Sequence, residues 1–190
     1  MPGLEPTTAR EPLHTRSIEI RGYKRADGLY DIEGHLVDTK PVDFRLAAGI
    51  RRAGEAVHDM WLRITIDAKL TIVDAAASMD AMPYTGDCNQ IVPAYRKLLG
   101  LSIGPGYQRH VKELLGGVRG CTHMTELAGA LATAAFQTMA GQRVGDPARR
   151  PFQLDRCHAL ESSARAVGRY YPKWYTGSEK VEPAGEADHH

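Results

Sequence analysis

Residues 17–38 read SIEIRGYKRADGLYDIEGHLVD, and this stretch decides the fold. Along 17–24 and again along 29–38, apolar residues and glycine alternate with mostly polar residues, which is the two-residue period of a half-buried strand. Between the two runs stands Asp27-Gly28, a pair that supplies the positive φ values of a tight hairpin turn. The stretch therefore predicts a β-hairpin near the start of the ordered chain.

A second pair of alternating runs, 57–67 and 69–79, extends the hairpin to an antiparallel meander of about four strands. After Pro83 the period of the apolar residues changes to nearly four, which is typical of helices. The pattern predicts helices over residues 93–99, 107–115, 122–139 and 154–169. Because the strands come first and the helices follow, we expect an α+β fold with three to four helices packed on one face of the sheet.

The length and the composition fit a single domain. A chain of 190 residues with 43% hydrophobic and 25% charged residues can bury a core without disulfides or metals. Proline and polar residues dominate 1–12 and 176–190, so we expect a flexible arm, a single domain over 13–175 and a flexible tail. The final pair, His189 and His190, is either native or the remnant of a tag, and we build no metal site on it.

The charge and the cysteines exclude several classes of protein. With 24 basic and 23 acidic residues there is no basic excess for nucleic acid, and no apolar run approaches the roughly 18 residues of a membrane span. The N-terminus has no apolar segment typical of a secretory signal. Three cysteines without tight spacing predict no disulfide framework, so a cytoplasmic location is expected.

Polar side chains gather on one predicted face of the sheet. Alternation places His58 on the core face of its strand and Asp59, Trp61 and Arg63 on the other face. On the first hairpin, the polar face carries Asp31, Glu33 and His35. A solvated face with cross-strand ion pairs explains this pattern as well as a binding site does. The indole of Trp61 favours a groove or an interface.

A second candidate group precedes the longest predicted helix. Thr122 suits the N-cap, and Cys121 before it would feel the positive end of the helix dipole, which favours a thiolate. The same field favours neutral His123, which can accept a proton or bind a metal. A buried cysteine beside a capping histidine is the structural alternative.

The sequence gives little support for a metal or a phosphate site. Ligands would be His58, His123 and Cys121 or a nearby carboxylate, but there is no His-x-x-x-His and no Cys-x-x-Cys. The glycines at 104–106 and 116–120 lack the spacing of a phosphate-binding loop and are typical of helix stops and turns. We therefore expect neither a metal nor another cofactor.

Four segments together resemble a known family. They are residues 14–23, 27–40, 58–61 and 117–123, with Tyr170, Tyr171, Pro172 and Trp174 near the end. With these segments the chain resembles the bacterial domain-of-unknown-function family 2889 over residues 13–175. The resemblance implies no catalytic residues. Members resemble proteins of bacteria that degrade aromatic and other small organic compounds, which implies a catabolic enzyme by association only.

Two hypotheses from different classes follow. The first is a cofactor-free lyase or isomerase that acts on an oxygenated aromatic compound by acid–base chemistry. Its catalytic residues would be His58, His123, Cys121 and Asp59, and its substrate-binding residues Arg63, Trp61, His35 and Glu33. The second is a homo-oligomeric binding or accessory protein, most simply a homodimer; a metal-dependent enzyme using His58 and His123 is a further alternative. The first hypothesis requires His58 and His123 to lie within about 10 Å of each other, at element ends that open to a cleft.

Overall fold

The computed structural model describes residues 4, 8–140 and 149–184. The chain divides into two compact units, one up to residue 140 and one from residue 141. The domain predicted over 13–175 extends across this boundary, and residues 141–148 lie outside the described residues. The predicted arm, 1–12, and the predicted tail, 176–190, lie partly outside the described residues.

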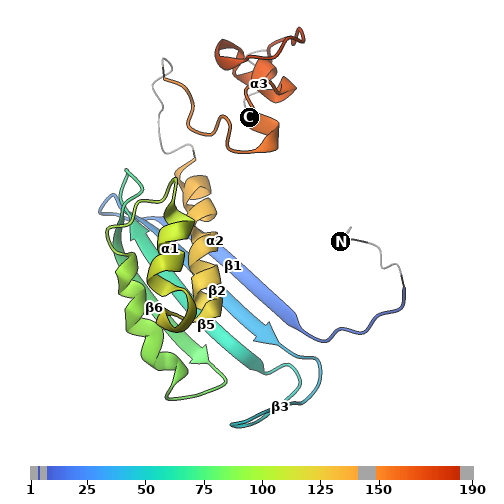
Figure 1. Cartoon of the computed structure of the whole chain (residues 1–190), viewed down its shortest axis with the longest axis vertical. Coiled ribbons are helices and arrows are strands. Elements are labelled where there is room, and N and C mark those ends of the chain that lie inside the picture. Colours follow the sequence, from blue (N-terminus) through green and yellow to red (C-terminus); the bar gives the residue numbers. More distant parts are fainter. Residues whose placement is uncertain (1–3, 5–7, 141–148, 185–190) are drawn as a thin grey trace. The chain divides into compact units, whose positions relative to one another are not determined.

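The larger unit is built on a four-stranded sheet (Figure 1). Its strands are β1 (Thr15–Lys24), β2 (Tyr30–Thr39), β5 (Ala56–Ile66) and β6 (Ile72–Ala81), in the order β1-β2-β5-β6. All neighbours are antiparallel, which confirms the predicted meander. Between β2 and β5 in the sequence, β3 (Phe44–Leu46) and β4 (Gly49–Arg51) form a small separate hairpin.

The two long turns of the meander form for local reasons. At the first, Gly28 has φ +85°, and the amide of Leu29 donates to the carboxylate of Asp27. At the second, the carboxylate of Asp67 accepts hydrogen bonds of 2.8 Å from the amides of Lys69 and Thr71. This capped turn is why β6 begins at Ile72 and not at residue 69 as predicted.

Of the four predicted helices, two are confirmed and two differ in the structure. The confirmed ones are α1 (Tyr107–Leu115) and α2 (Thr122–Met139), although Cys121, not Thr122, is the N-cap of α2. Instead of a helix over 93–99 there is a longer 3-10 helix, η1 (Cys88–Leu98). Two further short 3-10 helices are η2 (Gly117–Arg119) and η4 (Pro172–Trp174).

The helix predicted over 154–169 is replaced by two short pieces, η3 (His158–Leu160) and α3 (Arg165–Tyr170). Asp155 adopts a left-handed φ of 61°, and its carboxylate accepts from the amide and the hydroxyl of Ser162. These bonds hold a compact loop, which competes with a continuous helix.

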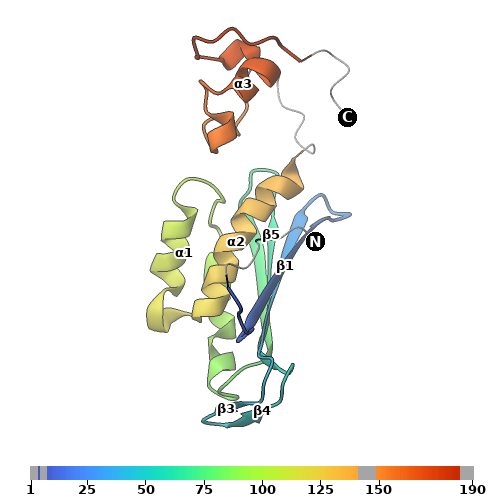
Figure 2. The ribbon, with the colours of Figure 1, turned by 90° about the vertical axis from the view of Figure 1, so that its right-hand side faces the viewer.

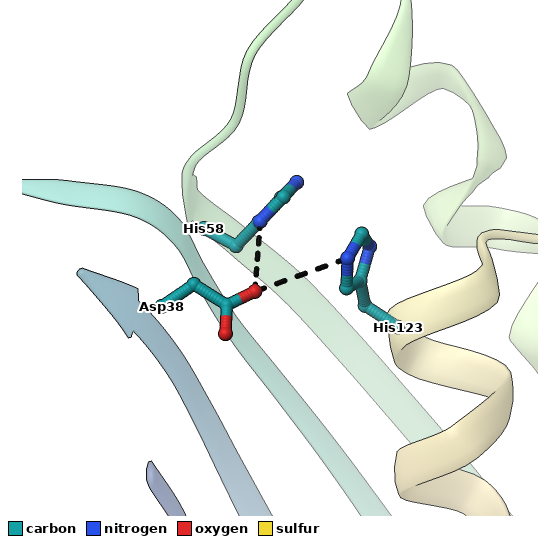
Figure 3. A group of neighbouring side chains, drawn as sticks. All are labelled: Asp38, His58 and His123. Carbon is teal, nitrogen blue, oxygen red and sulfur yellow. Dashed lines mark hydrogen bonds and ion pairs between the residues drawn. The ribbon is translucent and has the colours of Figure 1, made fainter. Parts of the chain in front are cut away.

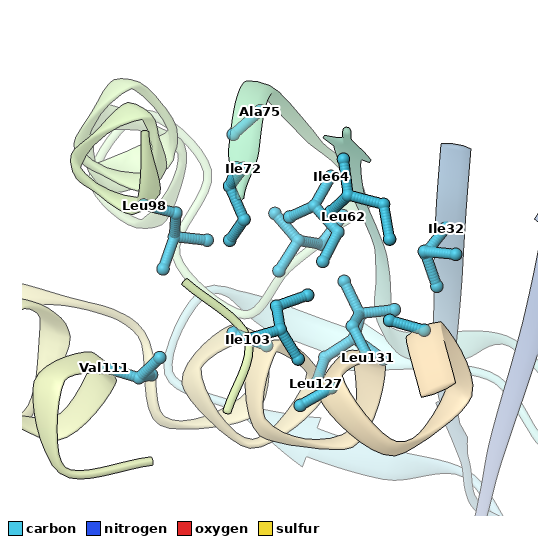
Figure 4. Packing of buried hydrophobic residues seen from close by; sticks show 14 of the residues in the cluster. Ile32, Leu62, Ile64, Ile72, Ala75, Leu98, Ile103, Val111, Leu127 and Leu131 are labelled. Atoms are coloured by element: carbon cyan, nitrogen blue, oxygen red, sulfur yellow. The ribbon is translucent and has the colours of Figure 1, made fainter. Parts of the chain in front are cut away.

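The core of the larger unit lies between the sheet and the helices. Helix α2 packs on β1, β2 and β5, and η1 packs on β6; Figure 2 shows α1 and α2 on the same side of the sheet. Apolar side chains of alternate strand residues fill this layer, including Ile32, Leu62 and Ile64 (Figure 4). Each such side chain contributes about 1.5–3 kcal/mol by leaving water. Among the described residues, none of the helices has the length and apolar character needed to span a membrane.

Candidate functional site

A row of polar side chains crosses three strands at one end of the sheet. The register pairs Arg16 of β1 with Asp38 of β2, and Asp38 with His58 of β5. All three lie on the face that the helices cover, since Asp38 alternates with the core residue Leu36. Asp38 is 3% exposed, so a buried carboxylate occupies the centre of the row.

Asp38 is held as a carboxylate by a full set of donors. Arg16 binds it with two hydrogen bonds of 2.8 Å, from Nε to Oδ1 and from Nη2 to Oδ2. Nε2 of His14 lies 2.9 Å from Oδ1, and Nδ1 of His58 lies 2.9 Å from Oδ2. Burial alone would raise the pKa of Asp38, but the hydrogen bonds from Arg16 and His14 outweigh it and hold that pKa well below its ordinary value of 3.8.

His123 reaches the same carboxylate from the first turn of α2 (Figure 3). Its Nε2 lies 3.8 Å from Oδ2 of Asp38, and its ring centroid lies 3.9 Å from that of His58. This confirms that His58 and His123 lie within about 10 Å of each other. Burial lowers the pKa of both imidazoles; at His58 it outweighs the hydrogen bond that the ring donates to Asp38, and at His123 the neighbouring His58 adds to it. Both shifts favour the neutral form of the imidazole.

Cys121 lies next to this cluster, and its backbone amide and carbonyl are hydrogen-bonded to Tyr95. Its Sγ is 3.7 Å from Nδ1 of His123. Its amide donates to the hydroxyl of Tyr95, and that hydroxyl donates to the Cys121 carbonyl. Cys121 is half-buried. Its role as a reactive thiolate stays a prediction.

The other predicted site residues lie on the opposite face of the sheet. There, His35 bonds Asp59 at 2.6 Å and stacks on Trp61 with 3.8 Å between ring centroids. Glu33 and Arg63 are neighbours across the strands, with 4.0 Å between Oε1 and Nη1. His58 and Asp59 are adjacent in sequence, so their side chains point to opposite faces. The structure thus brings together His58, His123 and Cys121, and separately Asp59, Trp61, Arg63, His35 and Glu33.

The sequence reading missed the residues that organise the first group. Asp38, Arg16 and His14 were not among the predicted site residues, and neither was Glu126, which binds Arg16 at 2.7 Å. One signal could have found Asp38. Continued alternation places it on the core face with Ile32 and Leu36, where an unpaired carboxylate would be costly and a paired one is informative.

The cluster of Asp38, His58 and His123 offers two kinds of chemistry. Its three ligand atoms lie within 4.8 Å of one another, so the group could hold a metal ion. Neutral imidazoles beside a fixed carboxylate could also move a proton. The side chains of His58 and His123 are 14% and 26% exposed, which lets water reach them. A groove of about 680 Å³ between α1 and α2 is lined in part by Glu126, the partner of Arg16, and not by the three cluster residues themselves.

Comparisons with known proteins agree with the resemblance seen in the sequence. A family model described as a protein of unknown function, DUF2889, matches residues 14–137. This range contains every residue of both groups. Neither the search of curated proteins nor that of solved structures gave a match.

Proposed function

The chain belongs to the DUF2889 family, whose description assigns no function, and we propose from its site that it is a small-molecule enzyme. The reaction centre is the cluster of Asp38, His58 and His123. One observation carries the proposal: imidazoles from β5 and α2 converge on a single carboxylate oxygen of Asp38 in β2, at a position that water reaches. A purely structural ion pair needs Arg16 and Asp38, but it does not need two imidazoles beside them.

The reaction that fits this centre moves a proton. A lyase or an isomerase removes a proton beside an oxygenated carbon and then expels a leaving group or returns the proton elsewhere. Asp38 is a positioning residue, because it fixes His58 through the 2.9 Å bond to Nδ1. The aromatic character of the substrate and the cytoplasmic location stay predictions, the first from the family resemblance and the second from the cysteine pattern.

The sheet carries two histidine–carboxylate pairs, His58 with Asp38 and His35 with Asp59, and they provide a matched test. A thermal-shift screen of oxygenated small compounds, followed by product analysis, would identify a substrate. With it, His58→Gln is expected to lower kcat by about 10²–10⁴-fold. The control is His35→Gln, which removes an imidazole bonded to Asp59 on the other face. Loss of turnover in His35→Gln with full turnover in His58→Gln would move the reaction centre to the opposite face.

The opposite face favours a second candidate, a homodimer in which this surface meets a second copy of the chain. Trp61 is 36% exposed and stacks on His35, and a large flat aromatic pair on an open sheet face is typical of contact surfaces. Sedimentation of the native chain is expected to give a dimer, and Trp61→Ala is expected to weaken it by at least about 30-fold. A native chain that sediments as a monomer would remove this candidate.

A further inference from the structure

Three potential metal ligands point at one position in the larger unit (Figure 3). Nδ1 of His58 and Nε2 of His123 face the same oxygen, Oδ2 of Asp38. We propose that Asp38, His58 and His123 hold a divalent transition-metal ion. Binding of the ion follows from this geometry, whereas its role in catalysis rests on the function proposed above.

The spacing of the ligand atoms fits an ion. Such ions bind imidazole nitrogen and carboxylate oxygen at about 2.0–2.2 Å, which places ligand atoms about 3.4 Å apart in a tetrahedral site. The two distances from Oδ2 of Asp38, 2.9 Å to His58 and 3.8 Å to His123, lie on either side of that value. All three ligand atoms lie within 4.8 Å of one another, so small side-chain rotations have to shorten the longest separation for all three to reach bonding distance.

The tautomers of the two histidines permit coordination. A distance of 3.8 Å is too long for a hydrogen bond, so no proton joins Nε2 of His123 to Asp38. The hydrogen of neutral His123 can instead lie on Nδ1, which faces Sγ of Cys121 at 3.7 Å. This leaves the lone pair of Nε2 directed at the centre of the cluster. At His58 the ion replaces the proton that Nδ1 shares with Asp38.

The surroundings of Asp38 form an outer shell for a metal ligand. Oδ1 accepts from Nε of Arg16 and faces Nε2 of His14, and Oδ2 accepts from Nη2 of Arg16. Hydrogen bonds of this kind fix a coordinating carboxylate and leave its remaining lone pair to the ion. Glu126 binds Nη1 of Arg16, so two carboxylates surround one guanidinium and the local charge is negative. A divalent cation is therefore attracted in spite of Arg16.

The ligand types select the class of ion and its role. Two imidazoles with one carboxylate suit Zn²⁺ or Fe²⁺ and leave coordination positions open, whereas Mg²⁺ and Ca²⁺ prefer oxygen ligands. Water reaches His58 and His123, so a water molecule could occupy an open coordination position. A bound ion would lower the pKa of that water and so supply a base for the substrate proton.

Metal binding is measured directly on the full chain. The protein carries no added tag and has the substitutions His189→Ala and His190→Ala, so the terminal histidines do not contribute. Chelator-treated protein is titrated with Zn²⁺, with Co²⁺ as a spectroscopic probe, with Fe²⁺ under anaerobic conditions, and with Mg²⁺. We expect one equivalent of Zn²⁺, Co²⁺ or Fe²⁺ per chain, ligand-field absorption from Co²⁺, and no binding of Mg²⁺.

Two ligand variants and one control test the assignment. His123→Ala and His58→Ala are each expected to weaken binding more than about 100-fold, and His35→Ala, on the opposite face, to leave it unchanged. Circular dichroism shows whether each variant is folded, and two ligand variants are made in case one is not. Absence of stoichiometric binding, or binding that His123→Ala retains, overturns the metal site. If the protein binds no ion but its turnover still requires His58, the metal site is wrong and the proposed function holds. If the protein binds the ion but turns over no substrate, the metal site holds and the proposed function is wrong.

Discussion

Replacing Asp38 with Asn is expected to lower the free energy of unfolding by about 3 kcal/mol, because it removes one partner of a buried ion pair. Asn keeps the shape of the side chain but not its charge. The guanidinium of Arg16 then loses two charge-assisted bonds of 2.8 Å, and His14 and His58 face an amide instead of a carboxylate. Urea unfolding in the presence of a chelator measures the change without competition from metal ions.

The matched control and an acid series separate this pair from general surface electrostatics. Glu126 binds the other end of Arg16 but is 52% exposed, so Glu126→Gln should cost less than about 1 kcal/mol.

The folded state lowers the pKa of Asp38, so the stability that this carboxylate contributes is complete above the unfolded pKa of about 3.9 and is lost as the pH falls below it. The unfolding free energies of native and Asp38→Asn protein should therefore converge in acid. A difference that stays constant down to pH 2 would contradict the assignment to Asp38.

Much of the fold of the larger unit could be predicted because its signals are local. The period of two over 17–38 and the turn at Asp27-Gly28 fix a hairpin without help from distant residues. Helix α1 ends before Gly116 and α2 begins after Gly120, so the glycines predicted to end helices and form turns also mark the helix boundaries in the structure.

The failures have causes that a periodic pattern does not contain. Residues 154–169 have the apolar spacing of a helix, yet the side chain of Asp155 binds Ser162 and closes a loop instead. The hairpin of β3 and β4 is only three residues on each side, which is too short for alternation to be recognised.

The site was half predictable for a related reason. His58 and His123 each lie at the end of an element, and the packing of α2 on the sheet brings those ends together. The same alternation that placed His58 on the core face placed Trp61 and Arg63 on the other, so these residues could not share one centre with it. Asp38 escaped notice because its role depends on Arg16 and His123, which are distant in sequence, and only the register of β1, β2 and β5 aligns them.

Replacing Gly34 with Val is expected to lower the free energy of unfolding by about 2–3 kcal/mol, although a β-branched residue suits a strand. A Cβ at Gly34 would lie 2.7 Å from Cδ1 of Leu127 and 2.9 Å from Cδ2 of Leu131, so these two side chains, or α2 with them, must shift. We expect part of the strain to move α2, and because α2 carries His123, that movement should pull the imidazole from Asp38 and weaken the binding of Co²⁺. Gly104→Ala is the control, since its Cβ meets no atom within 4 Å; we expect a change within about 0.5 kcal/mol. Urea unfolding and Co²⁺ titration of both variants test the coupling, and a Gly34→Val protein as stable as the native one would show that α2 does not rest on this glycine.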